Sequence, residues 1–229
     1  MNKKILTIVG AAFCAVLLVA GSIMGTLAYL TSTASVTNTF TVGNVSITLT
    51  ESKSDGSNER VTEENNYHLV PGTTYDKDPL ITVAANSEAS YIFVKVENGL
   101  SALEAAGESS IATQLKKGGW KLLTEYVEDY NEGKEPENQI STPITNAANV
   151  YVYNGNSATD YVVAKSNTNV DIQVFKTFSL KGDADLSTLD DTDDDGTIDA
   201  TIEVTAYAVQ ATGLANPYLA WTTAFGNVN

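Results

Sequence analysis

The stretch Ile198–Ala208, which reads Ile-Asp-Ala-Thr-Ile-Glu-Val-Thr-Ala-Tyr-Ala, decides the fold class of this chain. Apolar residues occupy every second position, and polar residues or Tyr207 occupy the positions between them. Alternation with a period of two is typical of a strand that turns one face toward a core and the other toward solvent. The stretch therefore predicts a long, half-buried strand.

The same alternation appears at several other places along the chain, namely 45–50, 92–96, 150–153 and 170–174, and Tyr161–Val163 is a further β-prone segment. Asn154-Gly155 stands between two of these segments and indicates a hairpin that joins Val150–Tyr153 to Tyr161–Val163. Many short strands of this kind are typical of an all-β fold in which two sheets pack into a sandwich.

Two segments favour helix over strand. Leu100–Lys117 combines spaced apolar residues with good helix formers, and it predicts a short, interrupted helix. Ala215–Phe225 carries Trp221 and predicts a final turn or helix that covers one end of the core. We therefore expect an all-β sandwich with short helical insertions.

The first residues of the chain have the layout of a secretory signal peptide. Lys3 and Lys4 precede the apolar run Ile5–Met24, and small residues follow up to Ala28. We predict a signal helix over residues 1–28, cleavage between Ala28 and Tyr29, and one secreted domain over residues 29–229. The alternative is an uncleaved anchor, because the apolar run is long enough to span a bilayer. Contact with a membrane is expected only through this segment.

The composition limits the classes of partner. The chain has 13 Lys and Arg against 28 Asp and Glu, a net charge of −15, which repels nucleic acid and favours cations or a basic partner. Its single Cys, Cys14, lies in the predicted signal, so no disulfide is expected in the mature protein. Acidic residues concentrate at Glu51–Glu64, Glu125–Glu137 and Asp183–Asp199, which we interpret as solvated loops.

The last of these acidic segments resembles a calcium-binding loop. Its oxygen ligands would come from alternating positions around the turn residue Gly196. The candidate ligands are Asp191, Asp193, Asp195, Thr197 and Asp199. Ile202 stands where such a loop normally has a bidentate Glu, so an acidic hairpin tip is the alternative.

Candidate catalytic residues are scarce. The chain has one His, His68, and lacks the H-E-x-x-H pattern of zinc proteases and the G-x-S-x-G pattern of serine hydrolases. His68 precedes Pro71-Gly72, and we expect it on the surface or in a turn. Asp76 and Asp78 form an acid pair, but sequence neighbours in an acidic segment are weak evidence for glycoside hydrolysis. The residues therefore favour a protein that is not an enzyme.

Several blocks of the sequence stand out together, namely Gly25–Thr31, Asn38–Glu51, Asn66–Gly72 with Tyr75–Pro79, Tyr91–Val96 and Val204–Gln210. In these blocks the chain resembles the TasA/camelysin family, in particular its clostridial branch. The resemblance implies a jelly-roll-like sandwich secreted by a Gram-positive bacterium and processed by a SipW-type signal peptidase. It also implies a role in the extracellular or biofilm matrix, where subunits join into fibres by donating an N-terminal strand. Camelysin adds an association with metal-dependent proteolysis.

The predicted mature N-terminus fits strand donation, because the chain carries no charge from Tyr29 to Thr50. Edge strands are usually protected by charge or Pro, and this segment has neither. The donor strand would run from Tyr29 to Val42, with Tyr29, Leu30, Val36, Phe40 and Val42 as its apolar residues. The alternative is that it pairs as an ordinary edge strand of its own subunit.

We therefore expect a secreted structural protein that self-associates into a homopolymer. The alternatives are a camelysin-like metal-dependent surface protease and a monomeric surface adhesin.

Overall fold

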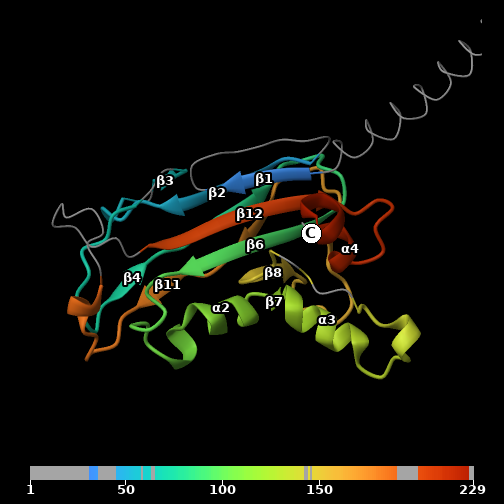
Figure 1. The fold of residues 1–229 in the computed structure, drawn as a ribbon. Helices are drawn as coiled ribbons and strands as arrows, with labels where there is room; N and C mark the ends of the chain where they lie inside the picture. Colours follow the sequence, from blue (N-terminus) through green and yellow to red (C-terminus); the bar gives the residue numbers. More distant parts are fainter. Residues whose placement is uncertain are drawn as a thin grey trace, which may run out of the picture.

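The computed structural model describes residues 31–35, 45–57, 59–62, 65–141, 144, 146–189 and 201–226. For 31–35 it describes the backbone. The regular secondary structure of this part of the chain is mainly antiparallel sheet, with a few short helices (Figure 1). The predicted signal helix over residues 1–28 lies outside the described residues. Within the described ranges, no helix is both long and apolar enough to cross a membrane.

The larger sheet has six strands. Its order is β1-β12-β6-β8-β7, and β9 also pairs with β6. All of these pairs are antiparallel. The strands are β1 (Thr31–Ser35), β6 (Ser90–Asn98), β7 (Trp120–Leu122), β8 (Val150–Tyr153), β9 (Val162–Val163) and β12 (Ile202–Gln210).

A second sheet of four strands has the order β10-β5-β2-β3, and β4 and β11 form a separate pair. These strands are β2 (Ile47–Ser52), β3 (Arg60–Val61), β4 (Thr74–Asp76), β5 (Leu80–Val83), β10 (Val170–Gln173) and β11 (Thr177–Ser179). β1 and β2 lie next to each other, so the two sheets approach along this border (Figure 1).

The helices lie on the larger sheet. They are α2 (Ile111–Lys117), α3 (Leu123–Asn131) and α4 (Pro217–Phe225), with 3-10 turns at Gly107–Ser109, Pro136–Asn138 and Leu186–Thr188. α2 and α3 contact β7, and α4 contacts β12. Ser110 and Asn216 cap α2 and α4 by accepting backbone N–H bonds through their side-chain oxygens.

The core has two clusters, one on each face of the larger sheet. Ile47, Ile81, Val94 and Ala206 belong to the cluster between the sheets. The second cluster packs the opposite face of the sheet against α3 and α4 and contains Phe93, Val152, Leu123, Val209 and Trp221. Because β6 supplies residues to both clusters, it is buried along most of its length.

The predicted strand around Val204 is confirmed as β12, with Val204, Ala206 and Ala208 buried on one face. The opposite face of β12 is not fully exposed to solvent, because the ring of Tyr207 packs edge-on against the ring of Trp221 in α4, with ring centroids 5.3 Å apart. The segment that carries Trp221 is confirmed as a helix, and it lies against the outer face of the sheet.

The predicted hairpin between β8 and β9 is wrong. Both strands pair with β6, β8 opposite Phe93–Lys95 and β9 opposite Ser90 and Tyr91. The free side of β8 pairs with β7 instead. The turn at Asn154-Gly155 therefore begins a loop that leads the chain further along the same edge of β6.

Two expectations about helices and loops need correction. The predicted helix over Leu100–Lys117 is confirmed only in its last part, as a 3-10 turn followed by α2. Glu125–Glu137, interpreted as a solvated loop, includes most of α3. The apolar residues of α3 recur three and four positions apart, which is the helical pattern, and they face the core: Leu123, Tyr126, Val127 and Tyr130.

Candidate functional site

The first candidate site is the β1 edge of the larger sheet. β1 pairs antiparallel with β12 from Thr31 opposite Val209 to Ser35 opposite Thr205. β12 pairs with β6 on its other side, so β1 is the last strand of the sheet on that side. Its outer backbone groups have no strand partner among the described residues.

β1 differs from the edge strands β3, β7 and β10, although the two-residue strand β9, which pairs only with β6, is also uncharged. β7 carries Lys121, β10 carries Asp171, and β3 carries Arg60. A charged side chain within an edge strand discourages pairing with a foreign strand. β1 consists of Thr, Ser and Ala, so this edge lacks that protection.

The predicted donor-strand residues Tyr29, Leu30, Val36, Phe40 and Val42 lie outside the described residues, as does Ala28 of the predicted cleavage site. The described part of the segment, Thr31–Ser35, pairs with β12 of its own chain. In a single subunit this is the arrangement of an ordinary edge strand. Donation of the strand to a neighbour stays a prediction.

The predicted calcium ligands Asp191, Asp193, Asp195, Thr197 and Asp199 also lie outside the described residues, and calcium binding stays a prediction. Within the described ranges, no three His, Cys, Asp or Glu side chains gather as a metal site. His68 is exposed, as expected, and its backbone carbonyl accepts a hydrogen bond from the Tyr75 hydroxyl at 3.0 Å.

The interpretation of Glu51–Glu64 as a solvated loop is wrong at its first residue. Glu51 is 2% exposed, because it lies within β2. Its carboxylate accepts a hydrogen bond of 2.6 Å from the Tyr67 hydroxyl and lies 3.0 Å from Lys77 Nζ. These two partners compensate the buried charge of Glu51. The pKa of Tyr67 is raised well above its ordinary value, first because the Tyr67 hydroxyl is buried and then because it donates a hydrogen bond to Glu51.

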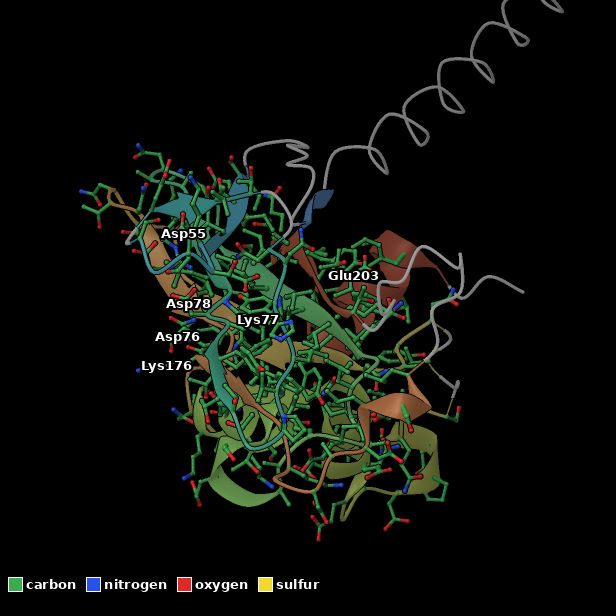
Figure 2. All side chains as sticks on the ribbon, turned by 90° about the vertical axis from the view of Figure 1, so that its left-hand side faces the viewer. Asp55, Asp76, Lys77, Asp78, Lys176 and Glu203 are labelled. Atoms are coloured by element: carbon green, nitrogen blue, oxygen red, sulfur yellow. The ribbon has the colours of Figure 1, made fainter. Side chains whose placement is uncertain are left out.

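Asp78, one member of the acid pair, is fully engaged by structural partners. Its carboxylate accepts a hydrogen bond of 2.8 Å from the Ser52 N–H and one of 2.9 Å from the Ser52 hydroxyl. It also accepts a hydrogen bond of 2.7 Å from the Arg60 guanidinium. Burial alone would raise the pKa of Asp78, but these hydrogen bonds outweigh it and lower the pKa. Figure 2 views the molecule from this side and labels Asp76, Lys77 and Asp78. An acid held ionised in this way ties β2 and β3 to the segment between β4 and β5, and it is unsuited to general acid chemistry.

The second candidate site is a cavity of about 460 Å³ on the side of the larger sheet that carries α3 and α4. Its walls come from α3, from the loop between β8 and β9, and from the loop between β12 and α4. Four tyrosines line it: Tyr91, Tyr126, Tyr130 and Tyr161. Lys121, Asp129 and Asp160 supply charged groups.

Sequence reasoning missed this cavity. Its tyrosines come from β6, from α3 and from the residue before β9. The acidic helix α3 was interpreted as a loop, so its tyrosine-bearing face was not recognised. The available signal was the helical spacing of Tyr126 and Tyr130 within that acidic segment.

No family model, no curated protein and no solved structure matches this chain.

Proposed function

We propose that this protein is a secreted structural component of an extracellular or biofilm matrix. Its subunits would join into homopolymeric fibres when β1 of one subunit pairs with β12 of the next. The observation that carries the proposal is the uncharged strand Thr31–Ser35 at the edge of a sheet whose opposite edge strand, β7, carries a charged residue.

The geometry of β1 and β12 suits exchange between subunits. Five consecutive residues of β1 face five of β12, Thr205–Val209, in a regular antiparallel register. A neighbour's β1 can form the same backbone hydrogen bonds on the same edge, because main-chain pairing does not depend on which chain supplies the strand. A head-to-tail contact of this kind propagates into a filament when the rotation between successive subunits does not close a ring.

The resemblance to the TasA/camelysin family supports the proposal from the sequence side. The family's jelly-roll arrangement, its matrix role and its processing by a SipW-type signal peptidase are part of the proposal. The predicted signal over residues 1–28 would direct the chain out of the cell, and removal of Lys3 and Lys4 would make the mature protein more acidic than the whole chain.

A cysteine pair across β1 and β12 tests strand donation directly. Ser35→Cys with Thr205→Cys joins two residues that are register partners, and directly opposed Cα atoms of an antiparallel pair lie within the range a disulfide requires. Cys14→Ser removes the chain's other thiol. We expect oxidised filaments of this variant to give a ladder of covalent multimers on a gel without reductant.

A matched control places the second cysteine inside one subunit. Lys95 and Thr205 are register partners within the β6–β12 pair, which strand donation does not alter. Lys95→Cys with Thr205→Cys should run as a monomer from the same filaments. A monomer band from the Ser35/Thr205 pair in well-formed filaments would overturn the donated strand. Failure to form filaments at any salt or protein concentration would overturn the structural role itself.

A further inference from the structure

The chain contains two Asn-Gly pairs, Asn98-Gly99 and Asn154-Gly155, which lie in different surroundings. Asn98 is the last residue of β6, and Asn154 follows the last residue of β8. An asparagine that precedes a glycine can lose its side-chain amide, because no Cβ on the glycine hinders its nitrogen from approaching the amide carbon of the asparagine. Whether the reaction proceeds in a folded protein depends on the hydrogen bonds that hold these two groups.

The side chains of the two asparagines make the same local hydrogen bond. The Oδ1 atom of Asn154 accepts the Asn156 N–H at 3.0 Å. The Oδ1 atom of Asn98 accepts the Leu100 N–H, also at 3.0 Å. Each bond folds the asparagine side chain back toward the peptide of the following glycine. A donor on Oδ1 also stabilises the negative charge that this oxygen carries once the amide carbon is attacked, so this bond does not distinguish the two sites.

The two glycine N–H groups differ. The Gly99 N–H donates to the Thr201 carbonyl at 2.9 Å, next to the start of β12. Glu104 also restrains the Asn98 side chain, because its carboxylate accepts a hydrogen bond of 3.1 Å from Asn98 Nδ2. The Gly155 N–H, by contrast, donates to no acceptor among the described residues, and Gly155 is exposed. The glycine nitrogen must lose its proton before it can attack, so the structure favours attack by Gly155 over attack by Gly99.

We propose that Asn154 is a site of spontaneous deamidation. A base from the solvent removes the Gly155 amide proton, and the Gly155 nitrogen forms a bond to Asn154 Cγ. The bond between Cγ and Nδ2 breaks, the leaving nitrogen takes a proton from water and departs as ammonia, and a cyclic succinimide remains. Water then opens the ring at either carbonyl and yields aspartate or isoaspartate. The net change is the gain of one water molecule and the loss of one ammonia molecule, with no oxidation or reduction.

The isoaspartate product alters a contact between two turns. The Gly119 carbonyl accepts the Asn154 N–H at 2.8 Å, and a Cβ at Gly119 would lie 2.9 Å from the Gly155 Cα, so the two backbones touch. In isoaspartate the main chain runs through the former side chain and gains one methylene between residues 154 and 155. The contact has no room for this methylene. We therefore expect isoaspartate, but not aspartate, to move the turn away from Gly119 and loosen the edge strand β7.

Incubation of the purified chain in mildly alkaline buffer made with heavy-oxygen water tests the proposal, because each ring opening incorporates one labelled oxygen. Peptide mapping by mass spectrometry should find the label at residue 154. At residue 98 it should appear at least about tenfold more slowly, since reaction there requires prior opening of the bond between Gly99 and Thr201. In urea, where the fold is lost, both sites should react at similar rates. Equal labelling of the two sites in the native chain, or an Asn154 that reacts only in urea, would overturn the proposal.

Two matched variants assign the ammonia that the native chain releases. Asn154→Gln keeps an amide but lengthens the side chain by one methylene, which disfavours ring closure, and it should lose most of the release. Asn98→Gln is the control and should leave the release unchanged. Equal effects of the two variants would contradict the assignment to Asn154. Thermal unfolding checks that each variant is folded, and if one does not fold, the ratio of labels in the native chain decides.

Hydrogen exchange measures the effect on the contact with Gly119. Ion exchange separates the deamidated chains, and an isoaspartyl methyltransferase identifies those that contain isoaspartate. In that fraction the N–H of residue 154 should lose protection several-fold, because its bond to the Gly119 carbonyl is broken. Asn154→Asp is the matched control, since it supplies the same charge on an unaltered backbone and should keep its protection. Equal protection in the two would contradict the role of the longer main chain. These outcomes are independent of whether the chain forms fibres.

Discussion

Glu51 and Lys77 form a buried ion pair at the border of β2. Removing one partner of such a pair leaves the other charge uncompensated away from water, which is more costly than losing an exposed pair. The Tyr67 hydroxyl can satisfy one oxygen of Glu51, but it cannot neutralise the charge. The Lys77 ammonium is thus required because Glu51 is buried.

We predict that Lys77→Met lowers the free energy of unfolding by about 3–5 kcal/mol. Urea denaturation of the variant and the native chain measures this difference. Lys165→Met is the control, because Lys165 pairs with Glu88 at the surface, with side chains 53% and 31% exposed. An exposed pair contributes roughly 0–1 kcal/mol. Similar losses in the two variants would contradict the role assigned to burial.

The lowered pKa of Asp78 makes the free energy of unfolding depend on pH. Because the fold lowers its pKa, its contribution is fully present above the ordinary value of 3.8 and is lost as the pH falls through the lowered value. We expect Asp78→Asn to be less stable than the native chain near pH 6, and the difference to shrink as the pH falls below 3.8. Urea unfolding at a series of pH values measures this. If the difference in stability between the two proteins stays constant down to pH ~2.5, the charge of Asp78 does not contribute to the stability of the fold.

At the scale of elements, β7 and β8 are held in register by a close contact between two turns. Gly119 joins α2 to β7 with a φ of 82°, and its carbonyl accepts the Asn154 N–H at 2.8 Å. A Cβ at Gly119 would lie 2.7 Å from the Asn156 nitrogen. The backbone atoms on both sides leave no room for a side chain.

Gly119→Ala should therefore cost more than an ordinary glycine replacement. The positive φ alone costs on the order of 1 kcal/mol, and the backbone contact should raise the total to about 3 kcal/mol. Gly133→Ala separates the two effects, because Gly133 also has a positive φ, 71°, but nothing lies near its added Cβ. Thermal or urea unfolding of both variants measures the difference, and equal costs would remove the steric argument.

The net charge of the molecule would oppose the proposed assembly. A chain with a net charge of −15 repels its own copies at low ionic strength, so the proposed contact at the uncharged β1 edge would have to overcome a long-range repulsion. Salt weakens this repulsion, because the Debye length falls to about 10 Å at 0.1 M.

We predict that sodium chloride shortens the lag before filaments form, as followed by light scattering and electron microscopy. Calcium chloride at the same ionic strength should shorten it further if the predicted loop around Asp193 and Asp195 binds calcium. Replacing these two residues with Asn should remove the extra effect of calcium and leave the effect of sodium chloride. A calcium effect that survives in this variant would place the ion elsewhere.

The face of β12 that is buried between the sheets could be predicted from the sequence alone. The alternation in β12 is a local property, since neighbouring side chains of any strand point to opposite faces, and Val204, Ala206 and Ala208 are buried accordingly. The helix that carries Trp221 and the exposure of His68 could be predicted for similarly local reasons.

The pairing of the strands and the surroundings of the charged residues depend on the tertiary fold. β8 and β9 flank a turn signal, but both pair with β6, because pairing depends on edges supplied by distant parts of the chain. Glu51 is buried because Lys77 and Tyr67 reach it from other elements. The cavity likewise exists only because α3 and two loops converge on β6, which brings together tyrosines that no short-range pattern connects.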